Sequence, residues 1–198
     1  DLAHAQRLYD ASSTHKLGYS TPILSYGRNS AGLPISCFLV AVADSKKGLV
    51  ESLSETAWLS MYGGGVGVYF SNRGADGKSV GVIPHMGVYD RASLAYKQGT
   101  TRRGSFAMYL DIGHPDIEEF LMIRRPKGDI NRQCLNLHQC VVINDDFMNK
   151  LEDKEPRALR LWGEILKTRL ETGEPYIMFE DNVNNNNPNS NNFFILTF

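Results

Sequence analysis

The run Cys37-Phe38-Leu39-Val40-Ala41-Val42-Ala43 restricts the possible folds of this chain more than any other stretch. It is apolar without interruption, so it predicts a strand over residues 36–43 in a parallel sheet that is covered on both faces. The pair Asp44–Ser45 follows at once and supplies side-chain oxygens that can cap a helix. The next apolar residues recur at helical spacing, at Leu49, Leu53, Ala57 and Met61. A buried strand that leads directly into a capped helix is typical of an α/β fold.

The rest of the chain continues this alternation of short strands and helices. Further strands are expected at 66–70, 105–111, 141–143 and 174–179. Helices are expected at 1–13, 85–96, 115–122, 145–151 and 158–172, with Gly173 as the C-cap of the last one. Loops rich in glycine, proline or charge separate them, at 17–35, 71–81, 97–104 and 124–132. We therefore assign the chain to the α/β class.

Charge and cysteine content exclude some classes of function. The formal net charge is −1, so no basic field favours direct contact with nucleic acid or a membrane surface. No apolar run approaches the roughly 18 residues of a membrane span, and the N-terminal residues do not resemble a secretory signal. The 3 cysteines cannot all pair with one another, which favours a reducing, cytoplasmic compartment over a disulfide framework.

Cys37 has two interpretations that the residues alone leave open. A free cysteine at a strand start is most often a small buried apolar residue. The alternative is a redox thiol, because strand ends beside glycine-rich loops are places where ligands enter α/β folds.

Two glycine-bearing segments follow in the chain. Gly63–Gly67 follows a helix and opens a strand, the reverse of a dinucleotide-binding turn, so its glycines are expected to allow a close backbone approach. Lys97–Gly104 combines cationic side chains with glycines, which suits either a phosphate site or a solvated turn. We interpret His114 and His138 as structural residues and the basic residues of 124–127 as surface charge.

Several short motifs follow one another along the chain in a definite order. They are Ser20-Thr21-Pro22-Ile23-Leu24, Leu33-Pro34-Ile35-Ser36-Cys37-Phe38-Leu39, Gly64-Gly65-Val66-Gly67, Gln98-Gly99 with Arg102-Arg103-Gly104, Gly113-His114-Pro115-Asp116-Ile117 and Gly173-Glu174-Pro175-Tyr176-Ile177. In this order and spacing they resemble the large (α) chain of class I ribonucleoside-diphosphate reductase, in particular its phage-type branch. The resemblance extends to Pro188.

This resemblance implies a fold and an activity. The family folds as a ten-stranded α/β barrel, of which residues 21–181 are expected to supply the first part. Residues 1–20 would end a helical N-terminal region, and the asparagine-rich residues 182–198 would form a disordered tail outside the family pattern. The family reduces ribonucleoside diphosphates to 2′-deoxyribonucleoside diphosphates by thiyl-radical chemistry.

The resemblance also implies roles for individual residues. Cys37 matches a redox-active thiol that becomes part of a disulfide. The substrate-binding positions are Thr21, Ser36, Cys37 and Gly65. The effector-binding positions are Asp44, Ser45, Lys46 and Arg73, where Arg73 is displaced by one position and Gly74 occupies the family's slot. Gln98 and Arg102 match residues that relay the identity of the effector to the substrate.

The same resemblance implies ligands and partners. No cofactor is expected within this chain, whereas ATP and deoxynucleoside triphosphates are expected as effectors. The radical-generating metal cofactor belongs to a separate small subunit. Further expected partners are the remaining segment or chain of the large subunit, a second α chain, and thioredoxin or glutaredoxin as the reductant.

One departure from the family pattern leaves alternatives open. The Asn-x-Cys-x-Glu loop of the radical cysteine, the partner of Cys37 and the C-terminal redox cysteines are not found in this sequence. We therefore expect a split or truncated part of a reductase, inactive without a complementing chain. The alternative is a non-catalytic remnant that binds nucleotide or a partner chain. An unrelated redox protein would need a resolving cysteine, and the sequence places neither Cys134 nor Cys140 for that role.

Overall fold

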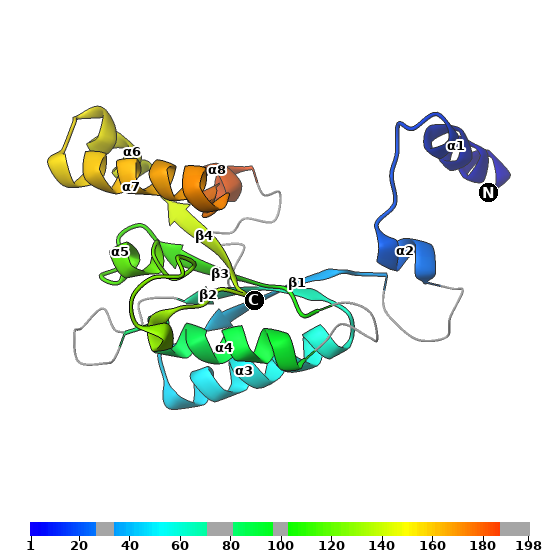
Figure 1. Ribbon diagram of the computed structural model, residues 1–198. Coiled ribbons are helices and arrows are strands. Elements are labelled where there is room, and N and C mark those ends of the chain that lie inside the picture. Colours follow the sequence, from blue (N-terminus) through cyan, green and yellow to red (C-terminus); the bar gives the residue numbers. More distant parts are fainter. Residues whose placement is uncertain (27–33, 71–80, 97–102, 187–198) are drawn as a thin grey trace. The chain divides into compact units, whose positions relative to one another are not determined.

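The computed structural model describes residues 1–26, 34–70, 81–96 and 103–186, apart from the side chains of Thr21 and Ser25. The chain divides into two compact units, Asp1–Ser36 and Cys37–Phe198 (Figure 1).

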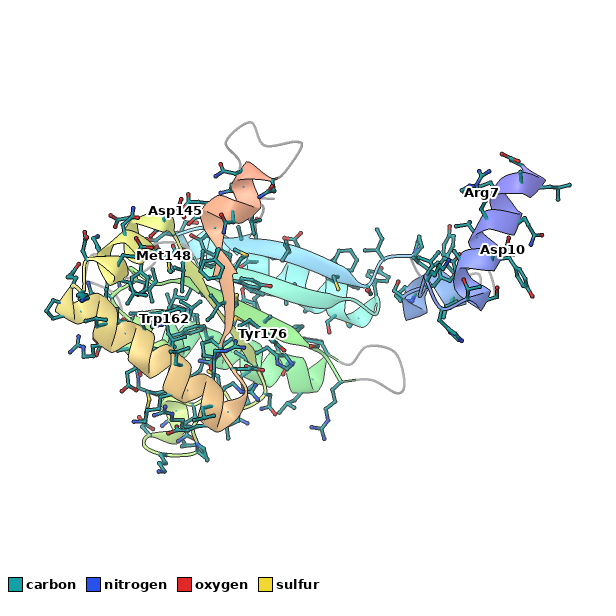
Figure 2. All side chains as sticks on the ribbon, turned by 90° about the horizontal axis from the view of Figure 1, so that it is seen from above. Arg7, Asp10, Asp145, Met148, Trp162 and Tyr176 are labelled. Carbon is teal, nitrogen blue, oxygen red and sulfur yellow. The ribbon has the colours of Figure 1, made fainter. Side chains whose placement is uncertain are left out.

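The described residues of the first unit form two helices. Helix α1 spans Leu2–Ser13 and is capped by Asp1, whose carboxylate accepts hydrogen bonds from the backbone amides of Ala3 at 3.0 Å and His4 at 3.4 Å. Polar side chains such as Arg7 and Asp10 lie exposed along this helix (Figure 2). Helix α2 spans Thr21–Ser25 and has a proline in its first turn, where the missing amide proton costs nothing. The predicted helix over residues 1–13 is confirmed.

The second unit is built on a five-stranded parallel sheet with the strand order β1-β2-β3-β4-β5. The strands are β1 (Cys37–Val42), β2 (Gly65–Phe70), β3 (Phe106–Asp111), β4 (His138–Ile143) and β5 (Tyr176–Phe179). The helices are α3 (Lys46–Met61), α4 (Ile83–Ala95), α5 (Ile117–Phe120), the 3-10 helix η1 (Ile130–Arg132), α6 (Asp145–Glu152), α7 (Pro156–Thr172) and α8 (Glu180–Asn185). Parallel neighbours joined by helices confirm the α/β class.

One face of the sheet carries the hydrophobic core. In β2 and β3 its side chains are at most 2% exposed, and they are Val66, Val68, Phe70, Phe106, Met108 and Leu110. Helices α3 and α4 lie along this face (Figure 1). Met86 and Tyr89 of α4 belong to the same buried cluster, and Leu49 and Leu53 of α3 pack against it. Phe120 of α5 and Ile165 of α7 extend that cluster.

The opposite face of the first three strands is less covered. We call it the half-buried face, and its residues are Cys37, Leu39, Ala41, Gly65, Gly67, Tyr69, Ala107, Tyr109 and Asp111. They share a face because successive strand residues point to opposite sides of a sheet. The register arranges them in rows across the strands: Cys37 beside Gly65, then Leu39 beside Gly67 and Ala107, then Ala41 beside Tyr69 and Tyr109.

The expectation that the first strand is covered on both faces is wrong for the described residues. In β1 only Val40 and Val42 are buried, while Leu39 and Ala41 are half-buried. A continuous apolar run therefore does not reveal which of its two faces is covered. β4 also begins at His138, earlier than the predicted 141–143, because His138 and Gln139 pair with β3.

The expected disorder of residues 182–198 is wrong at its start, where α8 reaches Asn185. The Asp181 carboxylate in α8 accepts a hydrogen bond from the backbone amide of Asp145 in α6 at 2.6 Å. This contact joins residues far apart in the chain, so local composition did not reveal it. Residues 187–198 lie outside the described part of the chain.

A buried carboxylate joins the starts of β4 and β5. Glu174 Oε1 lies 2.5 Å from His138 Nδ1, and Glu174 Oε2 accepts a hydrogen bond from the Gln139 amide at 2.9 Å. Arg124 Nε lies 3.4 Å from the same Oε2, and the Arg124 side chain also donates to the Leu137 carbonyl. The interpretation of Arg124 as plain surface charge is therefore wrong, because it pairs with a buried acid.

We expect Glu174→Ala to lower the free energy of unfolding by about 3 kcal/mol. Removing the carboxylate leaves the Gln139 amide without its partner and the half-buried Arg124 guanidinium with the Leu137 carbonyl but no acid. The matched control is Glu118→Ala, which breaks the exposed pair with Arg160 at 2.8 Å and should cost less than about 1 kcal/mol. Urea unfolding followed by circular dichroism measures both, and equal losses would contradict the role given to Glu174.

Candidate functional site

Cys37 and Gly65 stand side by side at the amino ends of β1 and β2. They are register partners in the parallel ladder, so their backbones run about 4.8 Å apart. Cys37 is exposed, and both residues lie on the half-buried face. The fold thus brings together two of the residues predicted to bind substrate.

The glycines before β2 permit this pairing. Gly63 has a φ of +97°, which L side chains rarely adopt. A Cβ on Gly64 would lie 2.3 Å from the ring of Phe38, so β1 and this turn pack too closely for a side chain there. The segment follows α3 and opens β2, as the sequence predicted. Gly63, Gly64 and Gly65 therefore form a border without side chains next to Cys37.

No disulfide joins the three cysteines, and their surroundings differ. Cys134 and Cys140 are at most 3% exposed. Burial raises the pKa of each of these two thiols to about 12, because the thiolate would lose its solvation. Since the thiolate is the reactive form, Cys37 is the cysteine available for chemistry. The alternative that Cys37 is a buried packing residue is wrong.

The other two predicted substrate residues belong to the first unit. Thr21 is the first residue of α2. Ser36 is the half-buried last residue of that unit and directly precedes Cys37 in the chain. Their contact with substrate stays a prediction.

The predicted effector residues Asp44, Ser45 and Lys46 lie beyond the carboxyl end of β1, at the opposite end of the strand from Cys37. Ser45 caps α3, as predicted, because its Oγ accepts a hydrogen bond from the Gly48 amide at 2.9 Å. A Cβ on Gly48 would lie 2.6 Å from the Ala43 carbonyl oxygen, so this glycine lets the first turn of α3 approach the strand end. The positive end of α3 and the exposed Lys46 ammonium together suit an anion.

The remaining predicted site residues, Arg73, Gln98 and Arg102, lie outside the described residues. Both flanks of segment 97–102 are described. Ser60 Oγ, near the end of α3, donates a hydrogen bond to the Tyr96 carbonyl at 2.8 Å. A Cβ on Gly104 would lie 2.7 Å from that carbonyl oxygen and 3.0 Å from Ser60 Oγ. The two flanks therefore meet at the end of α3.

Sequence analysis did not identify the tyrosines of the half-buried face. The Tyr69 hydroxyl donates a hydrogen bond to Asp111 Oδ2 at 2.7 Å. Burial, and then the bond to Asp111, raise the pKa of Tyr69. Burial likewise raises the pKa of the Asp111 carboxyl, and burial and Asp111 raise that of Glu180. The signal that could have found Tyr69 and Tyr109 is alternation, since every second strand residue shares the face of Cys37.

Metal-ligating side chains do not gather in the described ranges, where no group of three or more His, Cys, Asp or Glu residues could hold a metal ion. No helix in those ranges is long and apolar enough to cross a membrane.

The sequence is similar to proteins of one family. The family model described as ribonucleotide reductase, barrel domain, matches residues 35–159 and 153–194. The chain is 47% identical to the ribonucleoside-diphosphate reductase large subunit of Invertebrate iridescent virus 6, over 93% of this chain and 21% of that protein. It is 45% identical to the putative ribonucleoside-diphosphate reductase large subunit of Frog virus 3, over 91% of this chain and 34% of that protein.

A solved structure shows the same fold. The alpha subunit of the class Id ribonucleotide reductase of Actinobacillus ureae superimposes with a TM-score of 0.73 and 32% sequence identity, over 84% of this chain and 31% of that chain. This chain spans between 21% and 34% of the lengths of these relatives. They confirm the resemblance drawn from the ordered motifs and the partial α/β barrel that it implied. The chain belongs to the family of the ribonucleotide reductase barrel domain.

Proposed function

We propose that this chain is part of the large subunit of a ribonucleoside-diphosphate reductase, which reduces ribonucleoside diphosphates to 2′-deoxyribonucleoside diphosphates. The observation that carries the proposal is the exposed thiol of Cys37 next to the glycine border Gly63–Gly65. Membership of the family supports it. Thr21, Ser36, Cys37 and Gly65 then bind the substrate.

The electron balance of this reaction defines what Cys37 contributes. Replacing the 2′-hydroxyl by hydrogen consumes two electrons, which two thiols supply as they form a disulfide. One thiol hydrogen goes to the carbon, and the other leaves with the hydroxyl as water. Cys37 is one thiol. Cys140 is buried on β4, with β2 and β3 between it and Cys37, and Cys134 is buried as well. The second thiol and the radical that starts the reaction therefore come from outside the described residues.

Replacing Cys37 by serine should abolish the formation of deoxynucleotide. The assay uses the complete large subunit that contains residues 1–198, assembled with its radical-generating small subunit. Conversion of labelled CDP to dCDP, followed by chromatography, measures the activity. Serine cannot form the disulfide whose formation supplies the two electrons to the substrate.

The control for this substitution is Cys134→Ala, which removes a buried thiol and should leave turnover in place. Full activity of Cys37→Ser would overturn the role of Cys37. If the wild-type complex bound nucleotide without turnover, the alternative of a non-catalytic remnant would replace the proposed reductase.

We also propose that deoxynucleoside triphosphates and ATP bind as effectors at the start of α3, through Asp44, Ser45 and Lys46, with Arg73 from the following segment. The positive end of the helix favours phosphate. Lys47 pairs with Glu51 at 3.6 Å. The neighbouring Lys46 is exposed, and its ammonium suits phosphate oxygens. The Asp44 carboxylate is exposed and suits a sugar hydroxyl. Gln98 and Arg102 then carry the identity of the effector to the substrate.

Asp44→Asn should weaken the binding of the preferred deoxynucleoside triphosphate about tenfold or more, since it removes a charge-assisted hydrogen bond. Calorimetric titration of the complete subunit with dATP, dGTP, dTTP and ATP, each alone, measures the affinity. Glu51→Gln is the control, because it changes an exposed acid one turn further along α3 and should have little effect. Unchanged affinity in Asp44→Asn would contradict the role of this residue, and no binding to the wild type would contradict the effector site.

A second copy of the large chain is a further proposed partner. Between α3 and α4 lies an apolar groove of about 350 Å³, lined by Leu49, Val50, Leu53, Val88 and Tyr89 together with Lys46 and His85. Val50 is 70% exposed and Val88 is 50% exposed. The groove begins at Lys46, so a second copy seated there borders the proposed effector site.

Val50→Asp and Val88→Asp should each raise the dimer dissociation constant at least tenfold, because a charge in this groove loses its solvation when the second copy covers it. Sedimentation velocity of the complete subunit measures the change. The matched control is Leu170→Asp on α7, where Leu170 is 90% exposed and lies outside the groove. Equal effects of all three variants, or none, would contradict the assignment of the groove to the dimer.

The remaining partners are those that the reaction requires. We propose that a small subunit supplies the radical from its metal cofactor, that the rest of the large subunit supplies the second thiol, and that thioredoxin or glutaredoxin reduces the disulfide. Such a cycle works in a reducing compartment, so we propose a cytoplasmic location.

A further inference from the structure

The ring of Tyr109 leans across the neighbouring strand toward the end of the sheet where Cys37 lies. Tyr109 of β3 pairs in register with Tyr69 of β2. Nevertheless, a Cβ built on Gly67, one row nearer the amino ends of the strands, would lie 2.9 Å from Tyr109 Cε2 and 3.7 Å from Tyr109 Cδ2. The phenol ring therefore occupies the space that a side chain at position 67 would fill.

This lean brings the hydroxyl of Tyr109 next to the row of Cys37. The carbon Cε2 is adjacent to the carbon that bears the hydroxyl, so the polar end of the ring is the part over Gly67. The row of Cys37 and Gly65 follows the row of Leu39 and Gly67 directly. Successive rows on one face are about 7 Å apart, so the row of Gly67 and the row of Cys37 are immediate neighbours on the half-buried face.

The hydroxyls of Tyr109 and Tyr69 differ in their partners. The Tyr69 hydroxyl is occupied by Asp111 at 2.7 Å. The Tyr109 hydroxyl makes no hydrogen bond within the part of the chain that the structure describes, although its residue is half-buried. A half-buried hydroxyl without a protein partner is available to a ligand.

The surroundings of Tyr109 keep its hydroxyl protonated. Burial raises the pKa of Tyr109, and the negative forms of Cys140, Cys37 and Tyr176 raise it further. The coupling to Cys37 agrees with the geometry, since the ring leans toward that residue. At neutral pH the phenol is therefore a hydrogen-bond donor rather than a phenolate.

We propose that the Tyr109 hydroxyl, held over Gly67 one row from Cys37, donates a hydrogen bond to a ribose hydroxyl of the substrate and so positions the sugar against the thiol. The inference rests on the proposed function, because it takes the ligand at Cys37 to be a ribonucleoside diphosphate. A neutral donor suits a sugar hydroxyl better than a phosphate, which favours cationic partners.

The test measures how well nucleotides protect Cys37 from alkylation in the complete large subunit. Iodoacetamide labelling of the Cys37 peptide is quantified by mass spectrometry at increasing concentrations of CDP, 2′-deoxy-CDP and 3′-deoxy-CDP. Tyr109→Phe removes the hydroxyl alone and should raise the protecting concentration of CDP about threefold to tenfold, the loss expected for one hydrogen bond. For the deoxy analogue that lacks the contacted hydroxyl, Tyr109→Phe should not change the protecting concentration. A purely structural role of Tyr109 would not distinguish the three nucleotides.

Tyr69→Phe is the matched control, since it removes a hydroxyl from the same face at the adjacent register position, and it should leave the protection by CDP unchanged. Gly67→Ala provides a second route to the same effect, because its methyl group would displace the phenol ring as well as the end of the Leu39 side chain, which lies 2.5 Å from that position. The losses of protection by CDP that Gly67→Ala and Tyr109→Phe cause should not add in the double variant.

The remaining outcomes separate a failure of the role of Tyr109 from a failure of the proposed substrate site. Equal protection of the wild type and Tyr109→Phe by CDP would overturn the role of Tyr109 and leave the proposed substrate site standing. An equal loss of protection with all three nucleotides would also overturn it. No protection of wild-type Cys37 by any nucleotide would overturn the substrate site, and the inference with it.

Discussion

The pairing of β1 with β2 depends on glycines, both within β2 and in the turn that precedes it. A Cβ on Gly64 would collide with Phe38, and one on Gly67 would collide with Leu39 at 2.5 Å and with Tyr109. Glycine at these positions therefore lets the strands lie in register without displacing these side chains. The missing side chains also shape the candidate site. Gly64 contributes to the border of bare backbone beside Cys37, and Gly67 makes room for the ring of Tyr109. Packing and chemistry thus depend on one constraint, the close approach of backbone to aromatic and aliphatic side chains.

The two ends of β1 have different chemical character. At the amino end lie an exposed thiol, glycine backbone and a phenol. At the carboxyl end lie the capped start of α3, an exposed carboxylate and a lysine. In a parallel sheet all amino ends lie on one side and all carboxyl ends on the other, because each crossover helix returns the chain to the side where the previous strand began. The two kinds of end are therefore separated by the length of the strands. The proposed reducing site and the proposed effector site can accordingly share one strand without sharing space.

Much of this arrangement could be predicted from the sequence, because its signals are local. The apolar run before Asp44–Ser45 predicted both the first strand and the cap of α3, and the ordered glycine and proline motifs predicted the family. Contacts between distant residues could not be predicted in this way. Glu174 pairs with His138, which lies 36 residues earlier, and Tyr69 donates to Asp111, which lies 42 residues later. The half-covered state of β1 was also missed, because hydrophobicity along a strand does not show what packs against each side.

Helix α3 has a mechanical consequence that follows from what touches its two ends. Its first turn packs against the end of β1 through Gly48, and its penultimate residue Ser60 holds the Tyr96 carbonyl, with Gly104 pressed against both. A helix of 16 residues is a rod about 24 Å long. Rigid secondary elements of this kind can carry a displacement between distant places in a fold. A displacement of the first turn of α3 would therefore reach the residues that flank segment 97–102, because the last turn of the same helix contacts both of them.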